Sequence, residues 1–363
     1  MVAALLAAYT RWDADPRVSC IVLSGAGKVR RRGRKLVALS GRARPTPSSS
    51  SPSQAFCAGG DVKAVVAAVR EGRAADADAF FRAEYTLDWA ISRLATPHVA
   101  LLHGVVFGGG AGLVMHGRYA VATEGAVFAM PECGIGLFPD VGASHALPRL
   151  PGALGAWIAL TGARIHGPDL VRAGVASHYV PAAGLPALVA ALSCARPPRR
   201  RAPGSPCPIK AALDAASVPL PPGELGSVRA AVDAVFGDWA SSTLAEMRSR
   251  LAARAPGEPW AATALEAFDA ECPQSRAVTL ALLRAGARAP LGAALRLEFR
   301  AITTALAPGS DFCEGVTAKL VEKRAPAWRG GGGAAAVAVR LAPPAADREL
   351  ELGDAARGAR PRL

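Results

Sequence analysis

Apolar and polar residues follow two different periods along the first part of this chain of 363 residues. Residues 18–24 (VSCIVLS) form a β-branched run that is typical of a buried strand, whereas residues 62–70 repeat their apolar positions at helical spacing. Further strand-like runs occur at 97–102, 119–123, 126–128 and 176–180, and further helical runs at 2–13, 75–94, 109–116, 147–161 and 168–173. Because strands and helices alternate, the pattern predicts an α/β core over residues 1–195.

Beyond a Pro- and Arg-rich break the periodicity becomes helical throughout. Apolar residues recur at helical spacing over 228–239, 242–253, 260–271, 275–285, 291–305 and 312–322. After residue 328 the chain is rich in Gly, Ala, Pro and Arg, which is typical of a segment without a core. We therefore expect a helical region at 196–328 and a disordered tail at 329–363.

A basic and then Ser- and Pro-rich run interrupts the core at residues 28–54. This composition cannot bury enough apolar surface to fold, so it predicts a disordered insertion. The run also affects how the net charge of +13 is interpreted. The charge alone would suggest a nucleic-acid partner. Eight basic residues lie at 28–44 and a second group at 196–201, so much of the excess charge belongs to two loop-like segments. We therefore expect no nucleic-acid partner.

Cysteine and histidine give no sign of a metal site or of a disulfide framework. The seven cysteines are scattered without a CxxC pair, and the six histidines lack the spacing of metal ligands. This usage predicts reduced thiols in an intracellular compartment and no bound metal. No apolar run reaches the length of a membrane span, so we expect no membrane partner either.

Residues 104–144 hold the most informative candidates for chemistry. Glu132 and Asp140 stand there in otherwise apolar surroundings, where a carboxylate is costly to desolvate and its pKa is displaced. The three consecutive glycines at 108–110 allow a backbone to approach a ligand closely with its N–H groups free. Backbone donors that face a carboxylate suit chemistry at a carbonyl carbon.

A second glycine motif, AGGD at 58–61, lies on another predicted strand-to-helix turn. Two N–H groups that converge from such turns, each near a helix N-terminus, would form an oxyanion hole for a thioester or ester oxygen. Tight turns packed against a sheet are the alternative explanation, and neither motif decides between the two alone. Asp61 is an ordinary helix N-cap candidate, and GGGAG departs from the GxGxxG spacing of dinucleotide sites.

Together, FCAGGD at 56–61, HGVVFGGGAGL at 103–113 and FAMPECGIGLFPDVGAS at 128–144 resemble the enoyl-CoA hydratase/isomerase (crotonase) superfamily. Within it the chain is most similar to 3-hydroxyisobutyryl-CoA hydrolases, over most of residues 1–27 and 55–328. The resemblance implies a crotonase-like spiral of β-β-α turns with a helical C-terminal region. It also implies an acyl-CoA substrate, with coenzyme A as part of that substrate and no separate cofactor. A homo-oligomer is compatible with the family.

A functional role known in the family is expected here only for a residue whose position matches the family's motif. The resemblance implies that Gly60 and Gly109 supply the two N–H groups of an oxyanion hole and that Glu132 is the catalytic glutamate. It implies further that Asp140 is the aspartate that marks the hydrolase branch and that Glu84 contacts the substrate. All of these residues except Gly60 would also bind the substrate. An acid that faces an activated carbonyl can act as a general base or as a nucleophile through a mixed anhydride, and both routes stay open.

One position separates the branches of the superfamily. Hydratases carry a second catalytic glutamate two residues after the triple glycine, and here that position is Gly112. The resemblance therefore favours hydrolysis of an acyl-CoA thioester, with 3-hydroxyisobutyryl-CoA of valine degradation as the expected substrate. An enoyl-CoA hydratase or isomerase and a catalytically silent acyl-CoA-binding protein are the alternatives. A serine hydrolase is disfavoured, because the chain has no GxSxG motif.

The last three residues, Pro361-Arg362-Leu363, resemble a peroxisomal targeting tripeptide of the SKL kind. We therefore expect a peroxisomal location. Because many members of the family are mitochondrial, the mitochondrial matrix is the alternative compartment.

Overall fold

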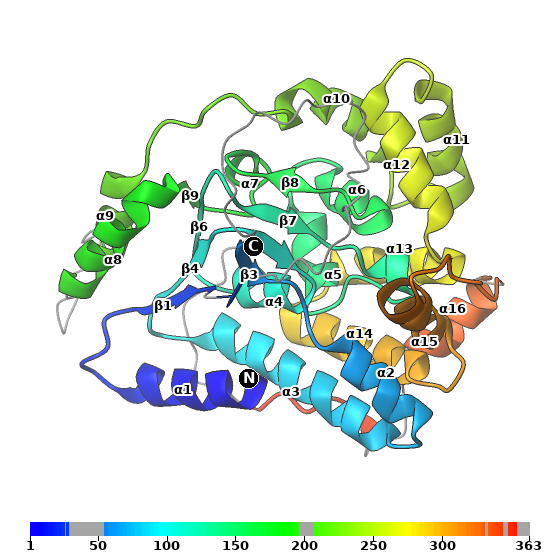
Figure 1. Ribbon diagram of the computed structural model, residues 1–363, viewed down its shortest axis with the longest axis horizontal. Coiled ribbons are helices and arrows are strands. Elements are labelled where there is room, and N and C mark those ends of the chain that lie inside the picture. Colours follow the sequence, from blue (N-terminus) through cyan, green and yellow to red (C-terminus); the bar gives the residue numbers. More distant parts are fainter. Residues whose placement is uncertain (26, 29–53, 196–206, 331–332, 344–347, 354–363) are drawn as a thin grey trace.

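Two small sheets lie at the centre of the molecule, with helices around them (Figure 1). The computed structural model describes residues 1–25, 27–28, 54–195, 207–330, 333–343 and 348–353. Within this part of the chain, no helix is both long enough and apolar enough to cross a bilayer.

The first sheet is wholly parallel, with four strands in the order β1-β4-β6-β9. Their bounds are Ile21–Ser24 for β1, His98–Leu102 for β4, Tyr119–Ala122 for β6 and His178–Tyr179 for β9. Every residue of β4 and β6 is buried, as expected for central strands of a parallel sheet. A separate apolar cluster joins this sheet to α8 (Leu185–Cys194) and α9 (Pro208–Ala216).

The second sheet has five strands in the order β2-β3-β5-β7-β8. Their bounds are Gly27–Lys28 for β2, Gln54–Cys57 for β3, Val105–Phe107 for β5, Val127–Ala129 for β7 and Ile165–His166 for β8. The three central strands are parallel to one another, and the two edge strands are antiparallel to their neighbours. Since β2 pairs with β3, the two ends of the predicted insertion lie together. Residues 29–53 themselves lie outside the described residues, so their disorder stays a prediction.

The chain passes from the first sheet to the second within a few residues at three places among the described residues, from β1 to β2, from β4 to β5 and from β6 to β7. Each central strand of the second sheet then leads into a helical element. These elements are α2 (Val62–Arg70) after β3, α4 (Gly109–Met115) after β5 and the 3₁₀ turn η1 (Glu132–Ile135) after β7. This is the spiral of β-β-α turns that the family resemblance implied, and the fold class is confirmed.

Two long helices lie on the lower side of the sheets in Figure 1, α1 (Val2–Ala14) and α3 (Ala74–Arg93), and they pack against each other. The inner face of α3 contributes Phe81 and Tyr85 to the main core. At the start of α2, the Asp61 carboxylate accepts a hydrogen bond from the Ala64 amide at 3.1 Å. The N-cap predicted at Asp61 is therefore confirmed.

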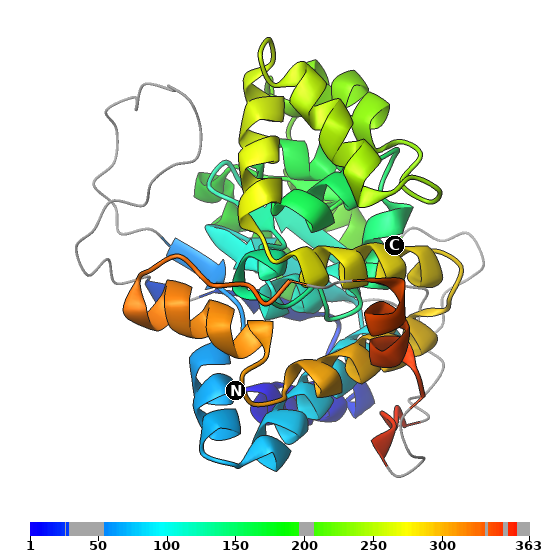
Figure 2. The same cartoon turned by 90° about the vertical axis from the view of Figure 1, so that its right-hand side faces the viewer.

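The region after the break is helical, as predicted. It contains α10 (Leu225–Phe236), α11 (Leu244–Arg254), α12 (Pro259–Ala270), α13 (Pro273–Gly286), α14 (Leu291–Ala305) and α15 (Asp311–Val316), which continues as the π-helical turn η4 (Thr317–Glu322). Figure 2 shows α10, α11 and α12 grouped at the top of the molecule, with α13 and α14 below them. Of these helices, α14 packs against α3.

The helix predicted over residues 147–161 is wrong in its first half. The structure has a short helix α5 (Ala143–Ala146), a 3₁₀ turn η2 (Leu147–Arg149) and then α6 (Leu154–Thr161). Pro151 cannot donate a helical hydrogen bond and Gly152 has a φ of 57°, so the chain is not helical from residue 150 to residue 153. The remaining short elements are α7 (Asp169–Arg172) and the 3₁₀ turn η3 (Ala182–Gly184).

The disordered tail predicted for residues 329–363 is also wrong in part. Residues Ala334–Leu341 form α16, which packs on α13 and α14. Farther on, Leu350 is only 2% exposed, and Glu349 forms a salt bridge with Arg300 of α14. Scattered apolar residues therefore tie this segment to the helical region despite its low-complexity composition. Residues 354–363 lie outside the described residues.

Candidate active site

Three neighbouring strands of the second sheet end at one place. The central strands β3, β5 and β7 are parallel, and the segments that follow their carboxyl ends carry Gly60, Gly109 and Glu132. Because the carboxyl ends of parallel strands meet at the same edge, ligands of α/β sheets bind there. The structure thus brings together three residues that lie far apart in the sequence and that sequence analysis selected.

The amides of Gly60 and Gly109 lie close together. A methyl group on Gly109 would be 3.5 Å from the Gly60 nitrogen and would collide with Oε1 of Glu84. Neither amide donates a hydrogen bond to any other described residue. Gly109 is also the first residue of α4, where a helix leaves its N–H groups unpaired. Two donors without partners among the described residues therefore lie close together on separate loops, which is the placement that an oxyanion hole needs.

Glu132 faces these glycine loops. A methyl group on Gly108, whose φ of 51° favours glycine, would lie 2.8 Å from Glu132 Oε1 and 3.6 Å from the Cα of Gly59. The Glu132 side chain is 6% exposed, and its Oε2 is buried without a hydrogen-bond partner among the described residues. Buried carboxylate oxygens are normally bonded, so this atom is available to a reacting group.

Asp140 and Glu84 reach the same neighbourhood from other elements. Asp140 lies between η1 and α5, Glu84 lies in α3, and both side chains are buried. Tyr85, the residue after Glu84, donates its hydroxyl to Asp140 Oδ2 at 2.9 Å. Sequence analysis missed Tyr85. The available signal was its place beside Glu84 in an apolar helix face, where a buried phenol needs a polar partner.

Burial raises the pKa of each of these carboxyl groups. Desolvation raises the pKa of Glu132 well above its ordinary value, and the negative charge of Asp140 raises it further. The pKa of Glu84 is raised for the same two reasons, in the same order. Desolvation also raises the pKa of Asp140, although the hydrogen bond from Tyr85 opposes the shift. These shifts agree with the displacement expected for Glu132 and Asp140, and such a carboxylate is a stronger base than a solvated one.

A further acid, Asp88, lies beside Gly112 and was missed by sequence analysis. A methyl group on Gly112 would lie 2.5 Å from Asp88 Oδ1 and 2.8 Å from the Cβ of Val141. Asp88 is 1% exposed, and its Oδ2 has no partner among the described residues. Desolvation, then the charges of neighbouring carboxylates, raises the pKa of Asp88 well above the ordinary value. A glutamate at position 112 would have to displace Asp88 and Val141, so the glycine there is a steric requirement.

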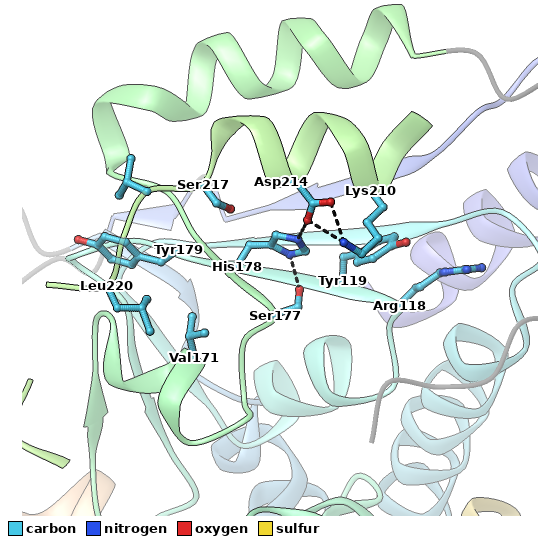
Figure 3. Close-up of a pocket in the computed structure, with 11 residues that line it drawn as sticks. Arg118, Tyr119, Val171, Ser177, His178, Tyr179, Lys210, Asp214, Ser217 and Leu220 are labelled. Carbon is cyan, nitrogen blue, oxygen red and sulfur yellow. Dashed lines mark hydrogen bonds and ion pairs between the residues drawn. The ribbon is translucent and has the colours of Figure 1, made fainter. Parts of the chain in front are cut away.

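A serine, a histidine and an aspartate also line a surface pocket of about 450 Å³ next to β9 and α9 (Figure 3). Ser177 Oγ lies 2.8 Å from His178 Nδ1, and His178 Nε2 lies 3.2 Å from Asp214 Oδ1. However, the Ser177 hydroxyl donates to the Ala120 carbonyl and accepts from the Ala120 amide. The Ala120 carbonyl therefore competes with the imidazole for the single hydroxyl proton. This group links α9 to the sheet, and we assign it no nucleophilic role.

Comparison with known proteins places most of the chain in one family. Residues 46–334 match the family described as Enoyl-CoA hydratase/isomerase. The protein of Rattus norvegicus named 3-hydroxyisobutyryl-CoA hydrolase, mitochondrial, is 35% identical over 322 residues. That alignment covers 88% of this chain and 74% of the rat protein.

Two solved structures resemble the whole fold. The enoyl-CoA hydratase from Rhodobacter sphaeroides 2.4.1 superimposes with a TM-score of 0.76 at 34% identity. The carnitinyl-CoA dehydratase from Mycobacterium thermoresistibile superimposes with a TM-score of 0.79 at 31% identity. Each comparison covers 97% of this chain and 91% of the other.

Proposed function

This chain belongs to the Enoyl-CoA hydratase/isomerase family, and from that premise we propose that it hydrolyses 3-hydroxyisobutyryl-CoA to 3-hydroxyisobutyrate and coenzyme A. The observation that carries the proposal is the Glu132 carboxyl group beside glycine loops in which the amides of Gly60 and Gly109 are free. A base or nucleophile next to two converging N–H donors suits the cleavage of an activated carbonyl compound. The name of the rat relative supports the choice of substrate.

In the proposed reaction, the thioester oxygen lies between the N–H groups of Gly60 and Gly109. These donors stabilise the negative charge that develops on the oxygen as the carbonyl carbon becomes tetrahedral. Glu132 acts at that carbon by one of two routes. As a general base it takes a proton from the attacking water; as a nucleophile it forms a mixed anhydride that water then hydrolyses. Either route releases the coenzyme A thiol and regenerates the Glu132 carboxylate.

Two further carboxyl groups assist this step. Asp140 works as a carboxylate that Tyr85 holds by a hydrogen bond, and its charge keeps Glu132 strongly basic. Glu84 lies against Gly109 and contacts the substrate next to the oxyanion hole. Coenzyme A enters as part of the substrate, and these steps use no separate cofactor.

Release of thiol from 3-hydroxyisobutyryl-CoA, measured with a thiol reagent, tests the function. We expect turnover by the wild-type protein, no turnover by Glu132→Ala and strongly reduced turnover by Asp140→Asn. Full rates in both variants would show that the two carboxylates are wrongly assigned. Tight substrate binding by folded wild-type protein without thiol release would instead identify a catalytically silent acyl-CoA-binding protein.

The second candidate function is that of an enoyl-CoA hydratase, and Asp88 favours it. Its buried carboxyl group stands beside Gly112, where the sequence resemblance places the second glutamate of hydratases. Hydration of crotonyl-CoA should therefore be measured beside thiol release. The loss of absorbance of the conjugated double bond reports the hydration. Hydration that outpaces hydrolysis and disappears in Asp88→Asn would select the hydratase. Hydrolysis that continues in Asp88→Asn without measurable hydration supports the thioesterase.

We also propose a peroxisomal location, which rests on Pro361-Arg362-Leu363 at the end of the sequence, outside the described residues. The rat relative is named as mitochondrial, so the mitochondrion is the competing destination. A fluorescent protein fused to the N-terminus should enter peroxisomes, and deletion of Leu363 should keep it out. A distribution that is unchanged by the deletion contradicts the proposal.

A further inference from the structure

The turn that carries Asp140 has a backbone conformation that its sequence alone does not favour. Val141 has a φ of 55°, in the left-handed region, and Gly142 follows with a φ of 81°. A β-branched residue is costly in that region and stays there only when surrounding contacts hold it. The position of the Asp140 side chain therefore depends on whatever fixes the residues after it.

Glu298 of α14 fixes the N–H side of this turn. The Gly142 amide donates to Glu298 Oε2 at 2.7 Å, and the Ser144 amide donates to Oε1 at 2.8 Å. The side chain is fully buried, and both carboxyl oxygens are used by the turn. Since α14 belongs to the helical region, this contact joins residues 156 positions apart in the sequence.

His116 fixes the carbonyl side of the same turn. Its Nε2 lies 2.7 Å from the Val141 carbonyl oxygen, and because a carbonyl only accepts, Nε2 carries the proton. Burial lowers the pKa of His116 to about 4, so the imidazole is neutral at physiological pH. The turn is thus held from two sides, by a carboxyl group with two acceptor atoms and by a single donor.

We propose that Glu298 is a positioning residue for thioester hydrolysis: its two oxygens hold the Val141–Gly142 turn so that Asp140 meets Tyr85 and faces the reacting groups. The helical region thereby contributes to the active site of the α/β core without touching the substrate. This inference rests on the proposed hydrolase function. It assigns to Glu298 an effect on the chemical step and not on substrate binding.

The variant Glu298→Gln tests the role while it keeps the size of the side chain. Its carboxamide offers one oxygen acceptor, and its NH₂ group faces one of the two backbone N–H donors. We expect the turn to shift and kcat for thiol release to fall roughly ten- to hundredfold, as misplacements of about 1 Å do. KM should stay within about threefold, since Glu298 is not part of the binding surface.

Asp169→Asn is the matched control. Asp169 is 6% exposed, and its Oδ2 also accepts from two backbone amides, those of Glu224 and Leu225 at 2.8 and 3.0 Å. Among the described residues, no hydrogen bond or ion pair joins Asp169 to Asp140. We expect Asp169→Asn to lower Tm as Glu298→Gln does, yet to keep kcat within twofold of the wild type.

An unchanged kcat in folded Glu298→Gln, or a loss no greater than that of Asp169→Asn, overturns the inference. If Glu298→Gln does not fold, Glu298→Asp decides, because it keeps the carboxyl group and both of its oxygens but withdraws them by one methylene. A kcat reduced at least threefold at unchanged KM supports the role, and a wild-type kcat overturns it. Failure of the proposed function is a separate outcome, since the wild-type protein would then release no thiol.

Discussion

Substitution of Gly109 by alanine should inactivate the enzyme without unfolding it. The new methyl group would collide with Glu84 Oε1 and lie 3.5 Å from the Gly60 nitrogen. It would therefore enter the space between the two amides, where the thioester oxygen is proposed to lie. The backbone itself accepts alanine here, because Gly109 is a helical residue and its φ is not in the left-handed region.

The expected magnitude follows from the two effects of the methyl group. Loss of one oxyanion donor costs about 10²- to 10³-fold in kcat, or about 3 to 4 kcal/mol in transition-state stabilisation. Gly109 is the first residue of α4 and its φ lies outside the left-handed region, so the cost of the new methyl group in stability is confined to its contact with the Glu84 side chain. Stability should therefore change far less than activity. We expect kcat to fall at least 10²-fold while Tm stays within a few degrees of the wild type.

Thiol release and thermal unfolding should be measured on the same preparation, with Gly226→Ala as the control. Gly226 also lies in the first turn of a helix, α10, and an added methyl group meets nothing within 4 Å. The control should keep both activity and Tm. The reasoning is refuted if folded Gly109→Ala retains kcat within threefold, or if its activity falls only in step with its folded fraction.

Three further predictions follow from contacts at and near the site. In Tyr85→Phe the hydrogen bond to Asp140 is lost, so the pKa of Asp140 should rise. The acid limb of the kcat–pH profile should then move to higher pH by about one pH unit. An unshifted profile would contradict the role of Tyr85. Asp61→Ala removes the N-cap of α2 and should lower the free energy of unfolding, measured in urea, by about 1 kcal/mol. Its kcat should stay within threefold of the wild-type value. A large loss of kcat would show that Asp61 takes part in the chemistry. Burial raises the pKa of Glu271 to about 8, so the folded protein holds a proton there that the unfolded chain has lost above pH 4.5. Wild-type stability should therefore fall relative to Glu271→Gln by about 1.4 kcal/mol per pH unit between pH 5 and 7.5, and parallel stability curves for the two proteins would refute the shift.

The sequence was sufficient to predict which residues lie together where they directly follow a strand. Gly60, Gly109 and Glu132 each come two or three residues after a strand of the second sheet, and parallel strands place such positions at one edge. The resemblance that these motifs carry implied the fold, and the structure places the three residues at one edge of the second sheet, while their roles stay proposals. The same reasoning explains the correct N-cap at Asp61, which depends only on the three residues that follow it.

The support of Asp140 could not be predicted from local pattern. Tyr85 and Glu298 lie 55 and 156 residues away from the groups they bind, and they meet them only because α3 and α14 pack together. Asp88 was missed for the same reason, since its place beside Gly112 depends on how α3 faces α4. Apolar periodicity shows that a helix face is buried but not which polar atom it carries into the core.

Two predictions were wrong for different reasons, one local and one tertiary. Residues 147–161 are mostly apolar, but the Pro151-Gly152 pair separates the 3₁₀ turn η2 from α6, because proline lacks an N–H and glycine adopts a left-handed φ. In the tail, composition suggested disorder, yet buried Leu350 and the ion pair of Glu349 anchor the chain. A single buried side chain and one ion pair are too small a pattern for composition to reveal.

The most direct test of the account is the rate of thiol release by Glu132→Gln, compared with Glu271→Gln. Both glutamates are 6% exposed, and each has an Oε2 without a hydrogen-bond partner among the described residues, but only Glu132 lies against Gly108, in the glycine loop that also carries Gly109. The account predicts at least about a 10²-fold lower kcat for Glu132→Gln, the usual contribution of a general base, and near wild-type kcat for Glu271→Gln. Equal rates in the two folded variants would contradict it.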